Sequence, residues 1–414
     1  MISISYSILD LIKRQKAEFQ SFKTLSYTSR VKESQLRKYL QSSLIKVVMG
    51  PRRAGKSRLI QKVLEDQNIA YINFEEEQFR STSGQQIIDA AQEIYPEAKY
   101  WYLDEVQDFP DWESLLNKLH RRQFNLIVTG SNSNLLSTEL ASALTGRHLP
   151  LELLPFSYGE YLTATQKDRG WTSYEAYLRS GGFPEVVLSG IDSRTYLSTL
   201  FDSIVLKDLV RRKKIRNPSY LSNCISLMMN NVAARTSARA LAKALKNEPS
   251  ATTVEKYIDM CREAYLIESI GSYHSKTKSR IQSERKPYAI DTGFLEAKSR
   301  QVMPLIGKQL ENSIYLELRR EGHSPAGEIY YYRGDDGIEV DFLIRDGFET
   351  VGLVQVCLDM SALETRDREV RALISAKKEH TNALMTIVTG NESGSIVVSK
   401  NDVIKVVPAH EFCS

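Results

Sequence analysis

The sequence contains no apolar run that approaches the ~20 residues of a membrane-spanning helix. The first 13 residues have only a short apolar stretch, with no basic flank before it and no small-residue cleavage site after it, so we expect no signal peptide. Cysteine is scarce, at four in 414 residues, and the four are too scattered to form a metal-binding motif. Few unpaired thiols are typical of a reducing compartment, so we expect a cytoplasmic protein without membrane contact.

Charge of one sign is not in large excess either, because the net charge is only +4. The basic residues are nevertheless clustered, in a block at 211–216 and in a second stretch at Lys276–Lys286. Such clusters can bind phosphate backbones, but they also fit a solvent-exposed face, so DNA stays open as a partner. The six histidines are scattered and indicate no separate metal site.

Four apolar runs alternate with polar, helix-like segments after an N-terminal region, residues 1–40, that is predicted to be helical. The runs are Leu44–Met49, Ile69–Phe74, Tyr100–Leu103 and Asn125–Thr129. Continuous apolar runs are typical of strands buried on both faces, so the alternation predicts an α/β fold with a parallel sheet and helices on both faces.

The second half of the chain has a different pattern. Beyond Pro155 we predict helices over 155–215 and, in short pieces, over 218–270. Strands return from Tyr288, and we predict them at Ile329–Arg333, Glu339–Ile344 and Val351–Val356.

The segment Gly50–Ser57 reads GPRRAGKS and fits the phosphate-binding pattern G-x-x-x-x-G-K-[ST] in full, between a strand pattern and a helix pattern. Its glycines let backbone N–H groups curl around phosphate oxygens, and the helix N-terminus adds a positive dipole end. Lys56 is expected to reach the β- and γ-phosphates of ATP, and Ser57 to place its hydroxyl on Mg²⁺. The expected nucleotide-binding residues are Gly50, Pro51, Arg52, Arg53, Ala54, Gly55, Lys56, Ser57 and Arg58.

The strand pattern at Tyr100–Leu103 ends in two acids, Asp104 and Glu105. An acid at the tip of a strand can hold Mg²⁺, so Asp104 is a candidate metal ligand together with Ser57. Glu105 can polarise the attacking water as a general base. An acid pair after a strand is common, but its position about fifty residues after Lys56 favours the catalytic interpretation.

The strand pattern at Asn125–Thr129 ends in small polar residues. In ATPases with an added central strand, a side chain at this place senses the γ-phosphate or orients water. Asn132 is the first candidate for this role and Ser131 the second. Arg147 follows a glycine and can neutralise transition-state charge, either within its own chain or across a subunit boundary.

In their order along the chain, these motifs resemble a family of prokaryotic AAA-type P-loop ATPases that carry an uncharacterised C-terminal domain of restriction-endonuclease-like fold. The resemblance extends from about residue 35 over most of the chain. It is carried by GPRRAGKS, YWYLDEVQ, LIVTGSNSNLLS, LTGRHLPLELLPFSYGEYL and GGFPEVV, and then by YAIDTGFL, GKQLENSIYLELRREG, YYYRGDDGIEVDFLI and VQVCLDMSALETRDREVRAL. By this resemblance, the nucleotide and magnesium positions are Lys56, Ser57, Asp104 and Glu105, the sensor region contains Asn132, and the arginine of the GR pair is Arg147.

The resemblance also implies an order of domains. The expected parts are an N-terminal helical segment (1–40), a P-loop ATPase core (41–154), a helical lid (155–215), a winged helix (216–285) and a restriction-endonuclease-like domain (286–414). Helix, turn, helix over Thr236–Leu245 and Ala251–Cys261 has the size of a DNA-reading module. The outward face of its second helix is only mildly basic, so DNA reading and protein packing both stay open.

A nuclease of the PD-(D/E)XK type needs an acid on one strand and an acid-x-lysine element on the next. Asp341 stands at the first position, and Glu311 on the preceding helix is a candidate accessory ligand. The second element reads Gln355-Val356-Cys357, in which neither glutamine nor cysteine supplies the required charge. We therefore predict that metal-dependent cleavage has been lost and that a binding surface remains.

Three functional hypotheses follow for a chain that uses ATP and Mg²⁺. The first is an ATP-driven switch or motor that acts on nucleic acid. The second is an ATP-gated protein-interaction module without direct DNA contact, and the third is an ATP-regulated nuclease. The sequence leaves open the macromolecular partner, the pathway and whether the protein forms a homo-oligomer.

Overall fold

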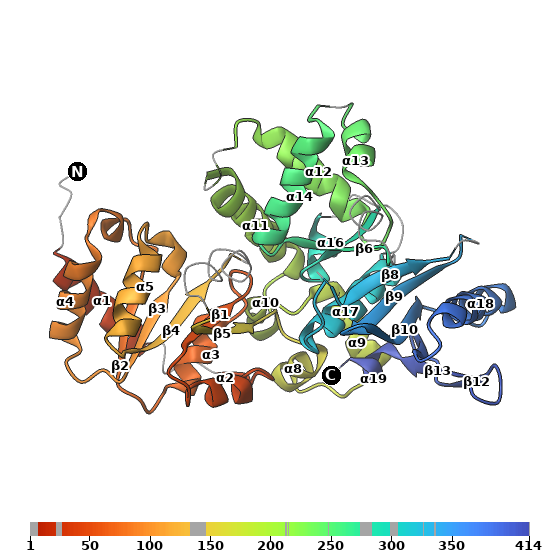
Figure 1. Ribbon diagram of the computed structural model, residues 1–414, viewed down its shortest axis with the longest axis horizontal. Helices are drawn as coiled ribbons and strands as arrows, with labels where there is room; N and C mark the ends of the chain where they lie inside the picture. The colour runs from red at the N-terminus through yellow and green to blue at the C-terminus, as the bar shows by residue number, and fades with distance from the viewer. Residues whose placement is uncertain are drawn as a thin grey trace. The chain divides into compact units, whose positions relative to one another are not determined.

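The computed structural model describes residues 7–21, 27–132, 146–211, 213, 215–246, 248–273, 284–298, 305–325, 327–334 and 337–413. The chain forms two compact units, Met1–Leu154 and Pro155–Ser414 (Figure 1). Within the described ranges, no helix combines the length and the apolar character that a membrane crossing needs. The boundary after Leu154 coincides with the end of the predicted ATPase core, while the finer division of the second unit stays a prediction.

The first unit is built on a parallel sheet of five strands in the order β2-β3-β4-β1-β5. The strands are β1 (Ile45–Met49), β2 (Ile69–Asn73), β3 (Tyr100–Asp104), β4 (Asn125–Gly130) and β5 (His148–Glu152). All four strands predicted from apolar runs are present, and β4 lies between β1 and β3 as the added central strand. The predicted parallel α/β fold is thus confirmed.

Helices cover both faces of this sheet (Figure 1). They are α1 (Ile8–Ser21), α2 (Glu33–Tyr39), α3 (Lys56–Val63), α4 (Gly84–Ile94) and α5 (Trp112–Arg121). One core cluster joins Phe19 of α1, Leu36 of α2 and Leu59 of α3 to strand residues such as Tyr71 and Ile127. Burial of these apolar side chains fixes the helices and, through them, the loops at the carboxyl ends of the strands.

A side chain of α1 forms hydrogen bonds with the backbone of the edge strand β2. Gln15 is buried, and its amide nitrogen donates to the Asn73 carbonyl at 2.9 Å, while its amide oxygen accepts from the Asn73 N–H at 3.0 Å. An edge strand otherwise presents unpaired backbone groups to solvent. The Gln15 amide therefore replaces one residue of a missing neighbour strand.

The opposite edge strand, β5, was not predicted as a strand. It contains Pro150, which removes a backbone donor, and its pattern of burial is irregular. A proline is tolerated here because, among the described strands, β5 pairs with β1 alone and lies at the edge of the sheet. Because its sequence is partly polar and contains proline, β5 is not recognisable as an apolar run.

The second unit begins with helices and matches the predicted helical character of 155–215. They are α8 (Tyr158–Thr165), α9 (Trp171–Ser180), α10 (Pro184–Ser189) and α11 (Ser193–Ile204), followed by a π-helical segment at Val205–Arg211. Helix α8 begins with a capping box in which Ser157 and Glu160 satisfy each other's backbone N–H groups. This pairing explains the spacing of the PFSYGEYL motif.

Three further helices follow: α12 (Pro218–Asn230), α13 (Ala238–Ala244) and α14 (Ala251–Glu263). After them comes an antiparallel pair of strands, β6 (Ile267–Gly271) and β7 (Arg285–Ala289). The predicted helical stretch 218–270 is therefore wrong at its end, where β6 begins. The helix predictions for α13 and α14 hold, with Ser237 and Ser250 as N-caps.

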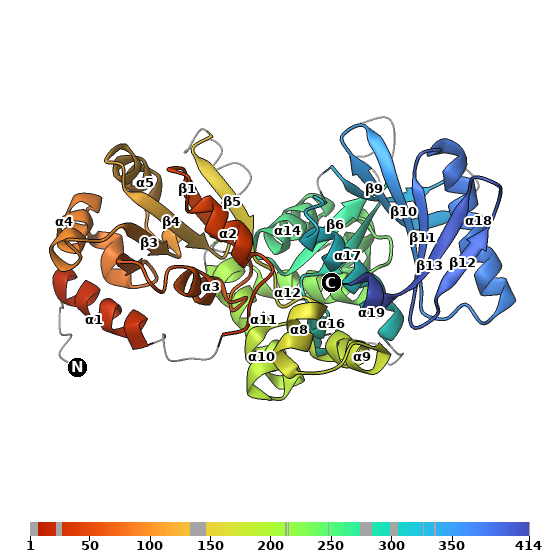
Figure 2. The same cartoon turned by 90° about the horizontal axis from the view of Figure 1, so that it is seen from below.

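A mixed six-stranded sheet occupies the remainder of the unit, in the order β12-β13-β11-β10-β9-β8. Helices α17 and α18 pack against it, and Figure 2 gives a second view of the sheet. Its strands are β8 (Ile329–Arg333), β9 (Glu339–Asp346), β10 (Glu349–Cys357), β11 (Leu384–Thr389), β12 (Gly394–Val397) and β13 (Val403–Pro408), and its helices are α16 (Gly293–Lys298), α17 (Ile306–Arg320), α18 (Leu363–Glu379) and α19 (Ala409–Phe412). The three predicted strands correspond to β8, β9 and β10.

Asp291 connects the two segments GGFP, at 181–184, and IDTGF, at 290–294. Its carboxylate accepts the Gly182 N–H at 2.8 Å and the Gly293 N–H at 2.9 Å. Gly181 has φ +74°, and a Cβ there would lie 1.9 Å from the Asp291 carboxylate, so only glycine fits. Burial raises the pKa of Asp291 to about 7.

Candidate functional site

The loop between β1 and α3 has the backbone that a phosphate-binding loop requires. Gly50 has φ +146°, and a Cβ at this position would lie 2.0 Å from the Leu153 carbonyl oxygen. Arg53 and Gly55 also have positive φ, and Gly55 is the N-cap of α3. These turns bring the loop to the amino end of the helix, where free backbone N–H groups and the helix dipole favour an anion.

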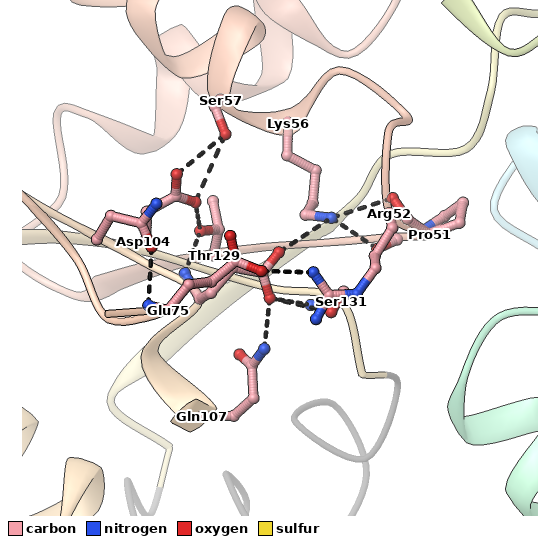
Figure 3. A network of polar contacts seen from close by, with 12 residues as sticks. Pro51, Arg52, Lys56, Ser57, Glu75, Asp104, Gln107, Thr129 and Ser131 are labelled. Atoms are coloured by element: carbon pink, nitrogen blue, oxygen red, sulfur yellow. Dashed lines mark hydrogen bonds and ion pairs between the residues drawn. The ribbon is translucent and has the colours of Figure 1, made fainter. Parts of the chain in front are cut away.

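Lys56 is the first residue of α3, and its side chain is 95% buried, with 5% exposed. Its ammonium donates to the carbonyl oxygens of Gly50 at 2.9 Å and Pro51 at 3.1 Å, and it lies 3.8 Å from Glu105 Oε1 (Figure 3). The ammonium is therefore held beside the loop that the sequence pattern assigns to phosphate. A point charge at this place can neutralise a phosphate oxygen.

Ser57 lies beside Asp104, as the predicted pair of metal ligands requires. Its hydroxyl donates to Asp104 Oδ2 at 3.2 Å, and the Tyr71 hydroxyl donates to the same oxygen at 3.2 Å. Ser57 is exposed and Asp104 is buried at the tip of β3. One hydroxyl and one carboxylate at adjoining strand and helix ends are oxygen donors of the kind that Mg²⁺ prefers, so these residues fit the ion.

Thr129, on the neighbouring strand β4, contacts both acids. Its hydroxyl donates to Asp104 Oδ1 and accepts the backbone N–H of Glu105 at 3.0 Å (Figure 3). The sequence interpretation did not single out this residue. Its position at the end of the central strand is the only signal that could have identified it, because its partners depend on the pairing of β3 with β4.

Glu105 follows β3 with φ +49°, which turns its side chain away from the path of the strand. Its Oε2 accepts hydrogen bonds from the Ser131 N–H at 3.1 Å and the Ser131 hydroxyl at 3.0 Å, and also from the Gln107 amide. Ser131, the second candidate for the sensor role, thus contacts the predicted base. Asn132 follows it, half-buried, at the same end of β4.

The two adjacent acids have opposite pKa shifts. Burial and the negative charge of Glu105 raise the pKa of Asp104, although Thr129 and Lys56 act against this. Burial would also raise the pKa of Glu105, but Lys56 and Arg52 outweigh it and lower the pKa. Glu105 is therefore ionised at neutral pH, which is the state that a general base needs.

Arginines surround the loop in different roles. Arg30 is buried, and its guanidinium donates to the Ala54 carbonyl at 2.8 Å and the Leu154 carbonyl at 2.6 Å, so it ties the loop to the segment after β5. Arg52 forms an ion pair with Glu75 at 2.7 Å, and Arg58 donates to Gln61 at 2.5 Å. The sequence analysis did not identify Arg30, which lies 24 and 124 positions from its partners.

Arg147 is not brought to this site within the first unit. It precedes β5, and its carbonyl accepts the N–H of Ile45 at the amino end of β1. The phosphate loop follows the carboxyl end of β1, about 16 Å away for five strand residues. A role for Arg147 as a sensor in its own chain does not fit this placement, and a role across a subunit boundary stays a prediction.

The predicted nuclease-like residues come together in the second unit. Asp341 of β9 and Gln355 of β10 are neighbours, because the Asp341 N–H donates to Gln355 Oε1 at 3.1 Å. Glu311 of α17 shares one partner, Lys286 of β7, with Asp341. Cys357 is buried, and burial raises the pKa of its thiol to about 11, so it carries no charge at neutral pH.

The basic clusters are described only in part. Of the block at 211–216, residues 212 and 214 lie outside the described ranges, and of the stretch Lys276–Lys286 only 284–286 lie within them. Several described basic residues form internal ion pairs: Lys213 with Glu263 at 2.7 Å, Arg285 with Glu255 at 3.6 Å. These charges are partly neutralised by the protein itself.

Comparison with known proteins gives matches along nearly the whole chain. Residues 42–162 match the family described as AAA domain, residues 172–302 a domain of unknown function (DUF8612) and residues 306–412 another (DUF4143). An uncharacterized protein of Haemophilus influenzae is 30% identical over 378 residues, which cover 85% of this chain and 91% of the relative. The uncharacterized protein MJ1544 of Methanocaldococcus jannaschii is 31% identical over 397 residues, which cover 88% and 87%.

Among solved structures, the Walker-type ATPase PABY2304 of Pyrococcus abyssi matches with a TM-score of 0.44 and 14% identity, over 66% of this chain and 95% of that chain. The sheet order, the phosphate loop and the match to the AAA domain define the first unit as an ATP-binding P-loop ATPase of the AAA type. Because the chain is 30% and 31% identical to these two relatives over most of their length, it belongs to their family. In this chain, the AAA domain precedes the DUF8612 and DUF4143 domains.

Proposed function

We propose that this protein hydrolyses ATP with Mg²⁺ and uses the reaction as a nucleotide-controlled switch. One observation carries the proposal: Lys56, Ser57, Asp104 and Glu105 lie together at the carboxyl edge of one parallel sheet. This edge is where nucleotides bind in open α/β sheets. Four side chains from two separate motifs meet there in the arrangement that phosphoryl transfer needs.

Each side chain has a role that follows from its contacts. Lys56 neutralises charge on the β- and γ-phosphates, and the backbone N–H groups of the loop orient them. Ser57 and Asp104 would hold Mg²⁺, which when bound supplies charge neutralisation on the phosphate oxygens. Glu105 is ionised and accepts a proton from the attacking water.

The Glu105 carboxylate is kept in position by donors on β4. Ser131 donates to Oε2 through both its N–H and its hydroxyl, while Oε1 faces the ammonium of Lys56. One oxygen is thus fixed by hydrogen bonds and the other lies on the side of the phosphate loop. Thr129 fixes the backbone N–H of Glu105 and one oxygen of Asp104, so it positions both acids.

Two substitutions test this assignment. Lys56→Ala should abolish ATP binding measured by calorimetry, whereas Lys62→Ala, an exposed lysine of the same helix that pairs with Glu65, should leave it intact. Glu105→Gln should retain ATP and slow hydrolysis by about 100-fold or more, which is the contribution of a general base. If Glu105→Gln hydrolyses ATP at the parent rate, the base is another group; if folded wild type releases no heat with Mg-ATP, the proposal fails altogether.

The target of the switch is proposed to be nucleic acid, through the three helices α12–α14 and the β6–β7 pair, which we interpret as a winged helix. The basic residues around these elements support the proposal. The ion pairs of Lys213 and Arg285 favour the second hypothesis, a module that binds protein, because these charges are already used inside the chain.

Salt dependence separates the two hypotheses. If the protein binds DNA, the affinity for a short duplex should fall as salt is added. A plot of the logarithm of the association constant against the logarithm of the salt concentration should have a slope of about −0.9 for each neutralised phosphate. Arg239 of α13 and Lys256 of α14 are exposed basic residues, so a chain with Arg239→Ala and Lys256→Ala should show a smaller slope. Binding that is absent at low salt, or independent of salt, favours the protein-interaction module.

We also propose that the C-terminal sheet is a restriction-endonuclease-like domain that has lost cleavage. The mixed sheet with parallel β10 and β11 and the proximity of Asp341 to Gln355 support the fold assignment. The neutral Gln355 and Cys357 support the loss of cleavage, because the second acid and the lysine are missing from β10. Magnesium-dependent nicking of DNA that disappears in Asp341→Ala would overturn this and restore the nuclease hypothesis.

A further inference from the structure

A lysine lies in the middle of the acids that the nuclease-like pattern places together. Lys286 of β7 is only 2% exposed. Its Nζ lies 2.8 Å from Asp341 Oδ1, 3.2 Å from Glu311 Oε1 and 2.7 Å from Glu339 Oε1. An ammonium group has three N–H donors, so all of them have a carboxylate partner in this arrangement.

The three acids come from two elements, one helix and one strand, that converge on the ammonium. Glu311 lies on α17, and Glu339 and Asp341 lie two residues apart on β9, on one face of the strand. The distances from Nζ to Asp341 and Glu339 are those of charge-assisted hydrogen bonds, and the distance to Glu311 is longer. The position that the carboxylates of a nuclease would give to a divalent cation is thus filled by a cation of the chain itself.

The other groups at this place are also engaged. Asp341 Oδ2 accepts the N–H of Val356 at 2.9 Å, so both oxygens of Asp341 have partners. The amide of Gln355 accepts from the Asp341 N–H and donates to Glu369 at 2.7 Å, on the α18 side. Among the described residues, no group of three or more His, Cys, Asp or Glu side chains has the geometry of a metal site. The residues do not fit a metal while Lys286 is present.

The electrostatics agree with the geometry. Burial would lower the pKa of Lys286, but Asp341, Glu311 and Glu339 raise it well above its usual range, so the ammonium stays charged. Burial and Asp341 raise the pKa of Glu311 to about 7, although Lys286 and a hydrogen bond from Tyr288 at 2.8 Å act against this. The Lys286 ammonium therefore stabilises the buried carboxylates of Asp341 and Glu311, while the half-buried Glu339 also pairs with Arg235 at 3.0 Å.

We infer that Lys286 is a built-in counter-ion that replaces the divalent cation of the nuclease-like acid cluster, so that this cluster binds a metal only when the ammonium is removed. The cluster formed by Lys286, Glu311, Glu339 and Asp341 then acts as a fixed ionic junction between β7, α17 and β9. This inference rests on the proposed restriction-endonuclease-like assignment of the C-terminal sheet and does not depend on the nucleotide site.

The experiment compares Mn²⁺ binding to the full-length wild type, Lys286→Ala, Lys286→Ala with Asp341→Asn, and Lys298→Ala. Lys298 pairs with Asp202, whose side chain is largely exposed, so its removal is the matched control for loss of a lysine. We expect Lys286→Ala to bind one more Mn²⁺ per chain than the wild type, by electron paramagnetic resonance. We expect the double variant and Lys298→Ala to match the wild type.

Two results would overturn the inference. One is a folded Lys286→Ala chain that gains no Mn²⁺. The other is that the wild type binds an Mn²⁺ that the single variant Asp341→Asn does not bind. The metal and the ammonium would then occupy the cluster together.

Thermal unfolding keeps the test decisive if Lys286→Ala is too unstable to titrate. The double variant loses one charge of each sign, so it should melt at a higher temperature than Lys286→Ala. If the double variant melts at the same temperature or lower, the carboxylates are not what Lys286 neutralises.

Discussion

Ser131 donates to a single oxygen of Glu105 from two of its atoms, with the N–H at 3.1 Å and the hydroxyl at 3.0 Å. Both bonds stabilise the ionised carboxylate, and they contribute with Lys56 and Arg52 to its lowered pKa. Ser131→Ala keeps the N–H but loses the hydroxyl. The pKa of Glu105 should rise, so that the acid limb of the ATPase pH profile moves up by about one pH unit, the equivalent of one such hydrogen bond. Ser131→Thr should restore the wild-type profile, and an unmoved limb in Ser131→Ala would contradict the assignment of Glu105 as base.

Thr129 is expected to control both acids. Thr129→Val has the same shape but removes the Thr129 donor to Asp104 Oδ1 and leaves the Glu105 N–H without its acceptor in a buried place, while Ser57 and Tyr71 still donate to Asp104 Oδ2. We expect ATPase activity, or the affinity for Mg²⁺ measured through it, to fall about 10- to 100-fold, as for other groups that orient metal ligands. Thr129→Ser retains the hydroxyl and is the control. Equal kinetics in the valine and serine variants would show that the hydroxyl has no role.

Arg30 is expected to support nucleotide binding without touching the nucleotide. Arg30→Met removes the donors to the Ala54 and Leu154 carbonyls and should destabilise the first unit by about 1–3 kcal/mol, the cost of buried groups left unpaired. ATP affinity should fall because the loop loses its anchor. Arg37→Met, which removes a pair between the half-exposed Arg37 and Glu33 and a long bond of 3.3 Å to the Val63 carbonyl, is the comparison and should have a smaller effect. The prediction fails if both variants bind ATP equally well.

Asp291 should make stability depend on pH. Its pKa is raised from 3.8 to about 7 by burial, so the folded chain holds a proton that the unfolded chain has released. The free energy of unfolding therefore decreases with pH. The contribution of Asp291 is greatest below about pH 4 and falls as pH rises toward about 7, by at most ~1.4 kcal/mol per pH unit. Asp291→Asn should flatten this part of the curve in urea unfolding between pH 5 and 7. It should also be less stable overall, because the amide offers only one acceptor oxygen to the two glycine N–H groups.

Local patterns predicted much of the fold of the first unit. The phosphate loop and the acid pair are each continuous in sequence, and continuous apolar runs identified β1 to β4. Thr129 and Arg30 were not predicted, because their partners are set by strand register and by chain segments up to 124 positions away. The strand β5 was not predicted because Pro150 and its polar neighbours interrupt the apolar pattern.

The second unit shows the same limit more clearly. Asp341, Glu311 and Gln355 were singled out correctly as neighbours, because they follow a known spacing. Lys286 was assigned only to a basic stretch, although it lies 55 positions before Asp341 and within 2.8 Å of it. Charge runs in a sequence do not reveal which of their members are buried, since burial depends on the tertiary fold.

The bidentate contact of Gln15 with Asn73 has a consequence for assembly. Because α1 covers the outer margin of β2, the sheet cannot grow at that margin by recruiting an extended peptide from another molecule. Cleavage of the chain after Ser21 would uncover a row of backbone donors and acceptors flanked by aromatic rings. Protein that lacks α1 should self-associate by adding strands at this edge of the sheet. Helix α1 thus prevents aggregation and also contributes to the core.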